Sequence, residues 1–269
     1  MSDPRSASPH TGHRERLRTR YAASGGEGFF EHEYLELLLT YAIPRKDTNA
    51  LAHTLLDRFG SLHQVMCADM EQLAQVEGVG ESTALFLTLQ KDLAKRLQLS
   101  ALADSNGRIK LGTPLSAAQY ACARLQYSPY ETVLVACLNA RCELLHSETL
   151  QKGSLVEAPI YPRNIAEIAL LRRAHSIVLM HNHPSGNPAP SGADADATEA
   201  VKSALSGIGV RLSDHLIVGG TSVYSFAAGV VLDLSGEEPR LCTLAEFSAG
   251  DDSAPRPLLR VMEPYHEPQ

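Results

Sequence analysis

The segment from His181 to Asp194 constrains the fold and the chemistry of this chain more than any other. It follows Ser176–Met180, a short apolar and partly β-branched run that is typical of a buried strand. Side chains alternate along a strand, so His181 and His183 would lie on the same face. Pro184 then ends the strand, because proline has no backbone N–H to donate. Two imidazoles placed in this way can reach a single metal ion together.

A helix is expected directly after the loop, with Ser191 as its N-cap and an end near Leu205. Asp194 would be the third residue of this helix. The residues that share a face with Asp194 are apolar, and those that share a face with Asp196 are polar: Ala197, Val201, Ala204, Leu205 and Ile208 against Glu199 and Ser203. The pattern therefore turns Asp194 inward and Asp196 outward. A buried carboxylate needs a strong partner, which a cation held with the two histidines would supply.

Simpler explanations exist for each half of this pattern. Ser191 and Asp194 form a capping-box-like pair that needs no metal, and two histidines on a strand can be structural. The combination is much rarer, because strand, loop and inward carboxylate converge on one point. Two imidazoles and one carboxylate leave an open coordination position, as in catalytic zinc sites. The same ligand set also describes the facial triad of non-haem iron oxygenases, although no cosubstrate motif is visible.

The string His181-x-His183, seven residues, Ser191-x-x-Asp194 resembles the JAMM motif of the MPN (JAB) metalloprotease-like domain. The fuller text HNHPSG, with DHLIVG downstream, resembles the bacterial RadC family, and the resemblance covers roughly residues 13–234. It implies one Zn²⁺ per chain, held by His181, His183 and Asp194, with a water in the fourth position. It also implies that Ser191 helps to hold an oxyanion and that a glutamate from an earlier strand is the general base.

Glu131 is the predicted general base. It begins the strand pattern 131–138 and, by position, matches the glutamate of the family. A carboxylate beside a zinc-bound water can take its proton, because the cation lowers the pKa of that water to about 7. Glu143, Glu148 and Glu157 are the other candidates for the general base. The alternative for Glu131 itself is a glutamate at a strand edge that faces water and has no catalytic role.

Two further residues, Asp214 and His215, are candidates to orient the ligands by hydrogen bonds. Ligating imidazoles usually need such partners to orient them. For His215, a core histidine with satisfied hydrogen bonds is an equally good interpretation.

The order of helix and strand patterns predicts an α/β protein of two parts. A small all-helical, helix-hairpin-helix-like domain at 13–100 would precede an α/β MPN (JAB, cytidine-deaminase-like) mixed-sheet sandwich at 105–234. Residues 1–12 are expected to be disordered and 235–269 to form a flexible tail, because both are rich in polar residues and proline.

The segment Leu73–Gly80 resembles a helix-hairpin-helix. In that motif Gly78 and Gly80 let backbone N–H groups approach a phosphate at a helix N-terminus, which predicts sequence-independent DNA contact. Glu81 departs from this pattern, since a negative charge does not suit a phosphate. A helical packing or protein-binding module therefore stays open. The basic run His13–Arg20 is read as a solvated helix face rather than as a nucleic-acid contact.

Composition narrows the class of protein. The net charge is −7, so the chain has no global basic footprint for nucleic acid. No long apolar run and no signal-peptide pattern occur, which predicts a cytoplasmic protein without membrane contact. The five cysteines show no CxxC spacing, which fits reduced thiols and argues against a cysteine zinc site.

Together these features predict a zinc-dependent hydrolase of JAMM type, a metallopeptidase or isopeptidase. A zinc-bound water activated by Glu131 would attack an amide carbonyl in a peptide or protein substrate. Two other functions stay open. One is a DNA-binding repair accessory with a vestigial metal site, since RadC proteins are traditionally labelled DNA repair proteins. The other is a metal-dependent nuclease.

Overall fold

The computed structural model describes residues 9–152, 161–236, 238–249 and 263–265. The chain divides into two compact units, Met1–Leu93 and Ala94–Gln269, and each is described by itself. The division falls inside a single long helix, so it lies slightly before the boundary expected near residue 100.

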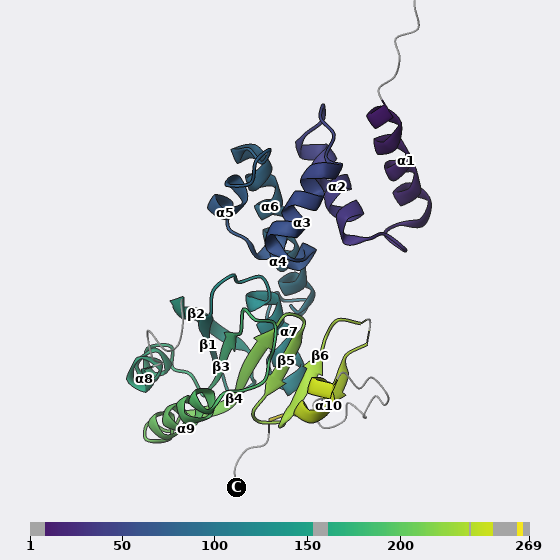
Figure 1. Cartoon of the computed structure of the whole chain (residues 1–269). Helices are drawn as coiled ribbons and strands as arrows, with labels where there is room; N and C mark the ends of the chain where they lie inside the picture. Colours follow the sequence, from purple (N-terminus) through teal and green to yellow (C-terminus); the bar gives the residue numbers. More distant parts are fainter. Residues whose placement is uncertain (1–8, 153–160, 237, 250–262, 266–269) are drawn as a thin grey trace, which may run out of the picture. The chain divides into compact units, whose positions relative to one another are not determined.

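The N-terminal unit is entirely helical in its described part (Figure 1). Its helices are α1 (Pro9–Ser24), α2 (Glu31–Ala42), α3 (Asn49–Phe59), α4 (Leu62–Cys67), α5 (Met70–Ala74) and the start of α6 (Glu81–Ala101). Helix α1 begins inside the segment that was expected to be disordered, and residues 1–8 lie outside the described part. The core of the unit consists of buried residues from the five helices α2 to α6, chiefly Leu35, Leu39, Leu55, Val65, Leu73 and Leu87.

The C-terminal unit contains a mixed seven-stranded sheet in the order β2-β1-β3-β4-β5-β6-β7. The strands are β1 (Thr132–Leu138), β2 (Leu144–Lys152), β3 (Ser176–Asn182), β4 (Arg211–Gly219), β5 (Ser222–Ser225), β6 (Val230–Asp233) and β7 (Arg240–Cys242). Strands β3 and β4 are parallel and every other pair is antiparallel. The predicted α/β class with a mixed sheet is confirmed.

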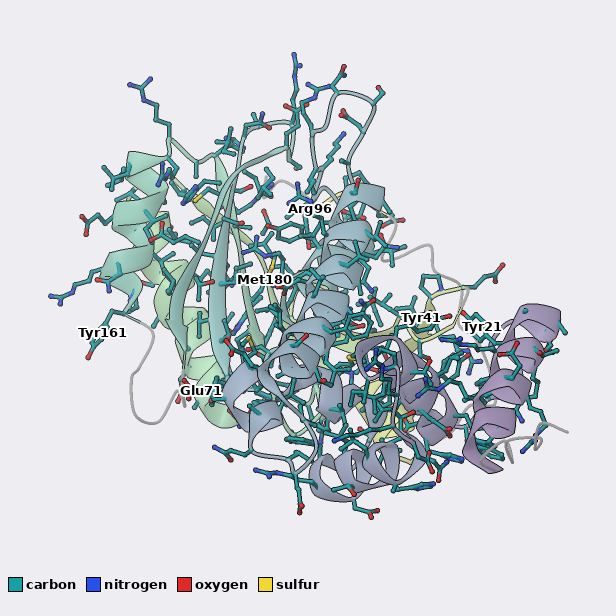
Figure 2. All side chains as sticks on the ribbon, turned by 90° about the horizontal axis from the view of Figure 1, so that it is seen from above. Tyr21, Tyr41, Glu71, Arg96, Tyr161 and Met180 are labelled. Atoms are coloured by element: carbon teal, nitrogen blue, oxygen red, sulfur yellow. The ribbon has the colours of Figure 1, made fainter. Side chains whose placement is uncertain are left out.

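Helices cover both faces of this sheet. Helix α7 (Pro114–Leu125) packs on one face, whereas α8 (Pro162–Leu171) and α9 (Gly192–Ser206) lie together over the other (Figure 1). The alternation of β3 explains both cores: Val178 and Met180 face α7, and Ile177 and Leu179 face α8 and α9. Figure 2 shows Met180 inside the unit, while Tyr161 at the start of α8 projects outward.

Ordered structure extends beyond residue 234, inside the segment that was expected to be a flexible tail. Strand β7 pairs with β6 and extends the sheet, and it is followed by helix α10 (Leu244–Ala249). Both elements beyond residue 234 are only a few residues long, and the polar stretches 235–239 and 250–256 on either side of them dominate the composition. Residues 263–265 also contact the unit, since the N–H of Tyr265 donates to the carbonyl of Gly112 at 3.0 Å.

Candidate metal centre

His181 and His183 lie at the end of β3, on the face that α9 covers. His181 follows Ile177 and Leu179 in the strand alternation and is completely buried. His183 comes one residue after the strand, and its N–H donates to the carbonyl of Val218 on β4 at 2.8 Å. The two Nε2 atoms are 3.1 Å apart. The sequence prediction that both rings share one face is confirmed in this geometry.

Asp194 meets the two rings from the first turn of α9. Its Oδ1 lies 3.1 Å from Nε2 of His181, and its Oδ2 lies 3.6 Å from Nε2 of His183. The Ser191 N–H and hydroxyl both donate to Oδ2, at 2.7 and 2.6 Å, which completes a capping box. The cap and the inward carboxylate therefore coexist, because the box uses Oδ2 and leaves Oδ1 facing the histidines. Asp196 is exposed, as the helix pattern predicts.

Glu131 approaches the same two histidines from a third segment of the chain. It immediately precedes β1, which pairs with β3 so that Val133 stands opposite His181. Its carboxylate and the ring nitrogens of His181 and His183 lie within 4.8 Å of one another, close enough to surround one ion. Glu131 is partly exposed, whereas the Asp194 side chain is 1 % exposed. The same imidazole pair therefore has two carboxylates beside it, the buried one of Asp194 and the partly exposed one of Glu131.

The charges of the site follow from these contacts. Burial alone would raise the pKa of Asp194, but its close contacts with His181 and His183 and the hydrogen bonds from Ser191 lower it below the usual carboxyl range. Burial would lower the pKa of His183, but its bonds to Asp194 and Asn187 and the charges of Asp194 and Glu131 raise it. Asp194 is therefore an anion that favours a positive charge beside it.

The donor set fits a divalent ion. Asp194 Oδ1 is buried and has no hydrogen bond among the described residues, because its approach to His181 has the distance of an ion pair without the geometry of a hydrogen bond. Nδ1 of His183 lies 2.9 Å from the carbonyl oxygen of Asn187, which can only accept, so Nδ1 carries the proton. When this ring is neutral, it presents the lone pair of Nε2 to the same point. Two imidazoles and a carboxylate suit zinc with an open fourth position, and His183, with 21 % of its side chain exposed, lies on the open side.

His215 and Asp214 are adjacent on β4 but point to opposite faces of the sheet. Nε2 of His215 lies 2.9 Å from Nδ1 of His181, so His215 does contact a candidate ligand. Burial lowers the pKa of His215 well below its ordinary value, so its ring is neutral. The carboxylate of Asp214 instead accepts hydrogen bonds on the α7 face, from Ser225 and Tyr265 among others. Strand alternation therefore leaves only His215 on the side of the site.

Sequence reasoning missed one residue of this network, Thr198. Its hydroxyl lies 2.6 Å from Nδ1 of His215 and 2.6 Å from the carbonyl oxygen of Asp194. The signal was present, because Thr198 stands four residues after Asp194 and so shares its helix face.

Gly78 and Gly80 lie in the N-terminal unit, in the turn between α5 and α6. Gly78 has φ +92°, a conformation that favours glycine, and Glu81 is the first residue of α6. The turn thus has the tight form expected of a helical hairpin, and DNA contact at this turn stays a prediction.

The comparisons with known proteins agree with this architecture. Residues 111–231 match the family described as RadC-like JAB domain. A UPF0758 protein of Ruegeria pomeroyi is 37% identical over 216 residues, which cover 80% of this chain and 95% of that protein. The chain belongs to the RadC-like JAB domain family. A UPF0758 protein of Fusobacterium nucleatum is 36% identical over 220 residues, which cover 80% of this chain and 94% of the relative.

The family match lies within the C-terminal unit, whereas the relatives match four fifths of the chain and so extend into the N-terminal unit. The family match includes every residue of the candidate centre, from Glu131 to His215. Among the described residues, no helix combines the length and the apolar character that a membrane crossing requires.

Proposed function

We propose that this chain is a zinc-dependent hydrolase of JAMM type that cleaves an amide or isopeptide bond in a peptide or protein. The observation that carries the proposal is the buried Oδ1 of Asp194, which faces two imidazole nitrogens and has no hydrogen bond among the described residues. A buried anion in this position is stabilised by a cation. Two further observations support the proposal: the match to a family of JAB domains, and the cluster in which ligand atoms of Glu131, His181 and His183 all lie within 4.8 Å of one another.

In this proposal His181, His183 and Asp194 hold one Zn²⁺ per chain. The ion, when bound, supplies a Lewis acid that polarises a carbonyl and makes a water more acidic. Glu131 would take the proton of the attacking water and return it to the leaving amine. Its position supports this role, because its carboxylate is near both histidines and is partly exposed.

Ser191 has a less direct claim to a role. The resemblance implies that its hydroxyl holds an oxyanion, but in the structure that hydroxyl donates to Asp194 Oδ2 at 2.6 Å. It would have to rotate away from Asp194 to meet a substrate. We therefore retain the oxyanion role as a prediction and assign Ser191 first to the positioning of Asp194.

The proposal is tested by peptidase and isopeptidase profiling of the full-length protein with bound metal quantified. The wild type should contain zinc and cleave at least one class of amide substrate, and Glu131→Ala should keep the zinc and lose turnover. Full activity in Glu131→Ala would remove Glu131 as the base. A wild type that binds no metal would overturn the mechanism as a whole.

Measurements on the same purified protein distinguish the alternative functions from hydrolysis of an amide bond. Iron rather than zinc in protein purified without added metal would favour an oxygenase site. Duplex cleavage that needs Asp194 but not Glu131 would favour a nuclease. Salt-dependent DNA affinity that survives loss of His181 would favour a DNA-binding accessory protein.

A further inference from the structure

The hydroxyl of Thr198 connects the main chain of α9 to the imidazole of His215. Its Oγ1 lies 2.6 Å from the carbonyl oxygen of Asp194 and 2.6 Å from Nδ1 of His215. On the far side of that ring, Nε2 lies 2.9 Å from Nδ1 of His181. All three side chains are buried, with exposed fractions of 8% for Thr198, 1% for His215 and 0% for His181. Buried polar groups are almost always hydrogen-bonded, so these contacts account for the protons of the three groups.

The direction of each hydrogen bond in this series follows from the carbonyl of Asp194 at one end of it. A carbonyl oxygen can only accept, so the single hydroxyl proton of Thr198 goes to Asp194, as is common for threonine in a helix. Oγ1 of Thr198 must then accept from Nδ1–H of His215. A neutral imidazole carries one proton, so Nε2 of His215 accepts, and Nδ1–H of His181 donates to it.

The consequence appears at the other nitrogen of His181. Once Nδ1 holds the proton, Nε2 has a free lone pair, and this atom lies 3.1 Å from both Nε2 of His183 and Oδ1 of Asp194. With the opposite tautomer a proton would occupy the space between these groups, where a cation would otherwise lie. The carbonyl of Asn187 favours the same tautomer at His183, with the proton on Nδ1 and the lone pair on Nε2.

We propose that Thr198 and His215 are positioning residues of the metal centre, which hold His181 in the tautomer that presents Nε2 to the ion. The inference rests on the proposed function only in taking the ion to be the cofactor of this site. Partners of this kind commonly change metal affinity by about 10- to 100-fold when they are removed. Thr198 and His215 would thus raise zinc affinity without contacting zinc.

Two measurements on the full-length chain test the proposal. Long-range ¹H–¹⁵N correlation spectra of the metal-free protein report the tautomer of each histidine ring, and chelator competition reports zinc affinity. We expect His181 and His215 both to be protonated at Nδ1 in the wild type. Thr198→Val, which removes the hydroxyl and keeps the shape, should yield mixed tautomers at His181 and bind zinc about 10- to 100-fold more weakly.

The controls separate positioning from stability. Thr198→Ser restores the hydroxyl and should restore both the tautomer and the affinity. Thr88→Val removes an equivalent bond within a helix, from Thr88 to the carbonyl of Ala84 at 3.0 Å, far along the chain from the site. It should leave zinc affinity unchanged even if it lowers the free energy of unfolding by a similar amount.

Each outcome decides the question. A wild type with His181 protonated at Nε2 overturns the proposal, whether or not the variants fold. Equal zinc affinity and equal tautomers in Thr198→Val and the wild type also overturn it. If the wild type takes up no zinc, the proposed function fails, while the spectra of the metal-free protein still decide the tautomer.

Discussion

A Cβ atom added to Gly219 would lie 2.5 Å from the backbone nitrogen of Pro188. It would also lie 2.6 Å from the carbonyl oxygen of Gly186. Gly219 ends β4, so the loop after β3 lies directly against the end of the neighbouring strand. The carbonyl of Asn187, in the middle of this loop, accepts from Nδ1 of His183. The absence of a side chain at Gly219 therefore sets the position of the group that orients a candidate metal ligand.

The substitution Gly219→Ala tests this relationship. The new methyl group would clash with backbone atoms, so the loop must move and carry the Asn187 carbonyl away from His183. We expect a lower free energy of unfolding, by about 1–3 kcal/mol, and weaker zinc binding. Gly192→Ala is the matched control, because a Cβ there meets no heavy atom within 4 Å. Unchanged zinc affinity in Gly219→Ala would show that the loop does not position His183.

Glu131→Gln separates the general base from the metal ligands. The amide keeps the shape of the side chain but cannot take a proton. We expect zinc content to stay at the wild-type level and kcat to fall by about 10²- to 10⁴-fold, the usual contribution of a general base. Glu148→Gln serves as the control, since Glu148 lies on β2, is exposed and pairs with His146. Loss of zinc in Glu131→Gln would instead make Glu131 a ligand.

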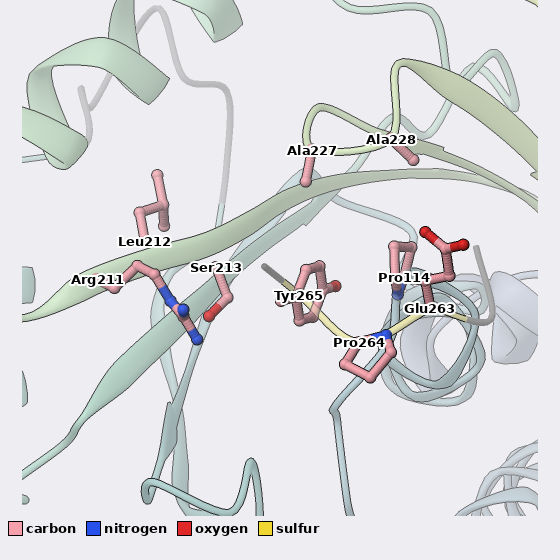
Figure 3. A pocket seen from close by; sticks show the side chains of 9 residues that line it. All are labelled: Pro114, Arg211, Leu212, Ser213, Ala227, Ala228, Glu263, Pro264 and Tyr265. Atoms are coloured by element: carbon pink, nitrogen blue, oxygen red, sulfur yellow. The ribbon is translucent and has the colours of Figure 1, made fainter. Parts of the chain in front are cut away.

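Asp214 and Tyr265 form a buried contact on the opposite face of the sheet from the centre. Figure 3 shows Tyr265 among the residues that line a pocket of about 330 Å³. Burial raises the pKa of Asp214 to about 6, against the lowering effect of hydrogen bonds from Ser225, the N–H of Ala227, and Tyr265 at 3.1 Å. An unfolded aspartate titrates near 4, so between about pH 4 and pH 6 the folded state binds more protons. The contribution of Asp214 to stability is therefore largest below this interval and falls as the pH rises, by about 3 kcal/mol in all.

The substitution Tyr265→Phe should increase the stability that the protein loses as the pH rises and Asp214 ionises. Without the hydroxyl, the ionised carboxylate loses a donor, so its pKa rises further. Thermodynamic unfolding should show a decrease of about 2 kcal/mol at pH 8, typical of a bond to a charged group, and a smaller decrease at pH 5. Tyr161→Phe, at an exposed tyrosine, should change stability at neither pH. An equal decrease at both pH values would mean that Tyr265 does not stabilise the charged form of Asp214.

The local pattern was sufficient to predict the segment from β3 to α9. Strand alternation placed His181, the N-cap at Ser191 fixed the start of the helix, and the helix period turned Asp194 inward. These features depend on neighbours in sequence, so they can be read without knowledge of the fold. The position of Glu131 was expected only from the family resemblance, because its approach to the histidines depends on the pairing of β1 with β3.

Other features depend on packing between segments that are distant in sequence, and the sequence pattern did not predict them correctly. Asp214 and His215 were grouped as partners of the ligands, although strand alternation alone separates them onto opposite faces. Thr198 was overlooked because its role requires β4 to bring His215 against α9. The short elements β7 and α10 stand between stretches of polar residues that are typical of a tail, and β7 is a strand because it pairs with β6.

The most direct test of the account is the zinc content of three full-length proteins, measured by elemental analysis after purification and dialysis. The wild type should hold one zinc per chain, Asp194→Ala should lose most of it, and Asp196→Ala should match the wild type because Asp196 faces outward. A wild type without zinc, or equal zinc in the wild type and Asp194→Ala, would contradict the assignment of this site as a metal centre.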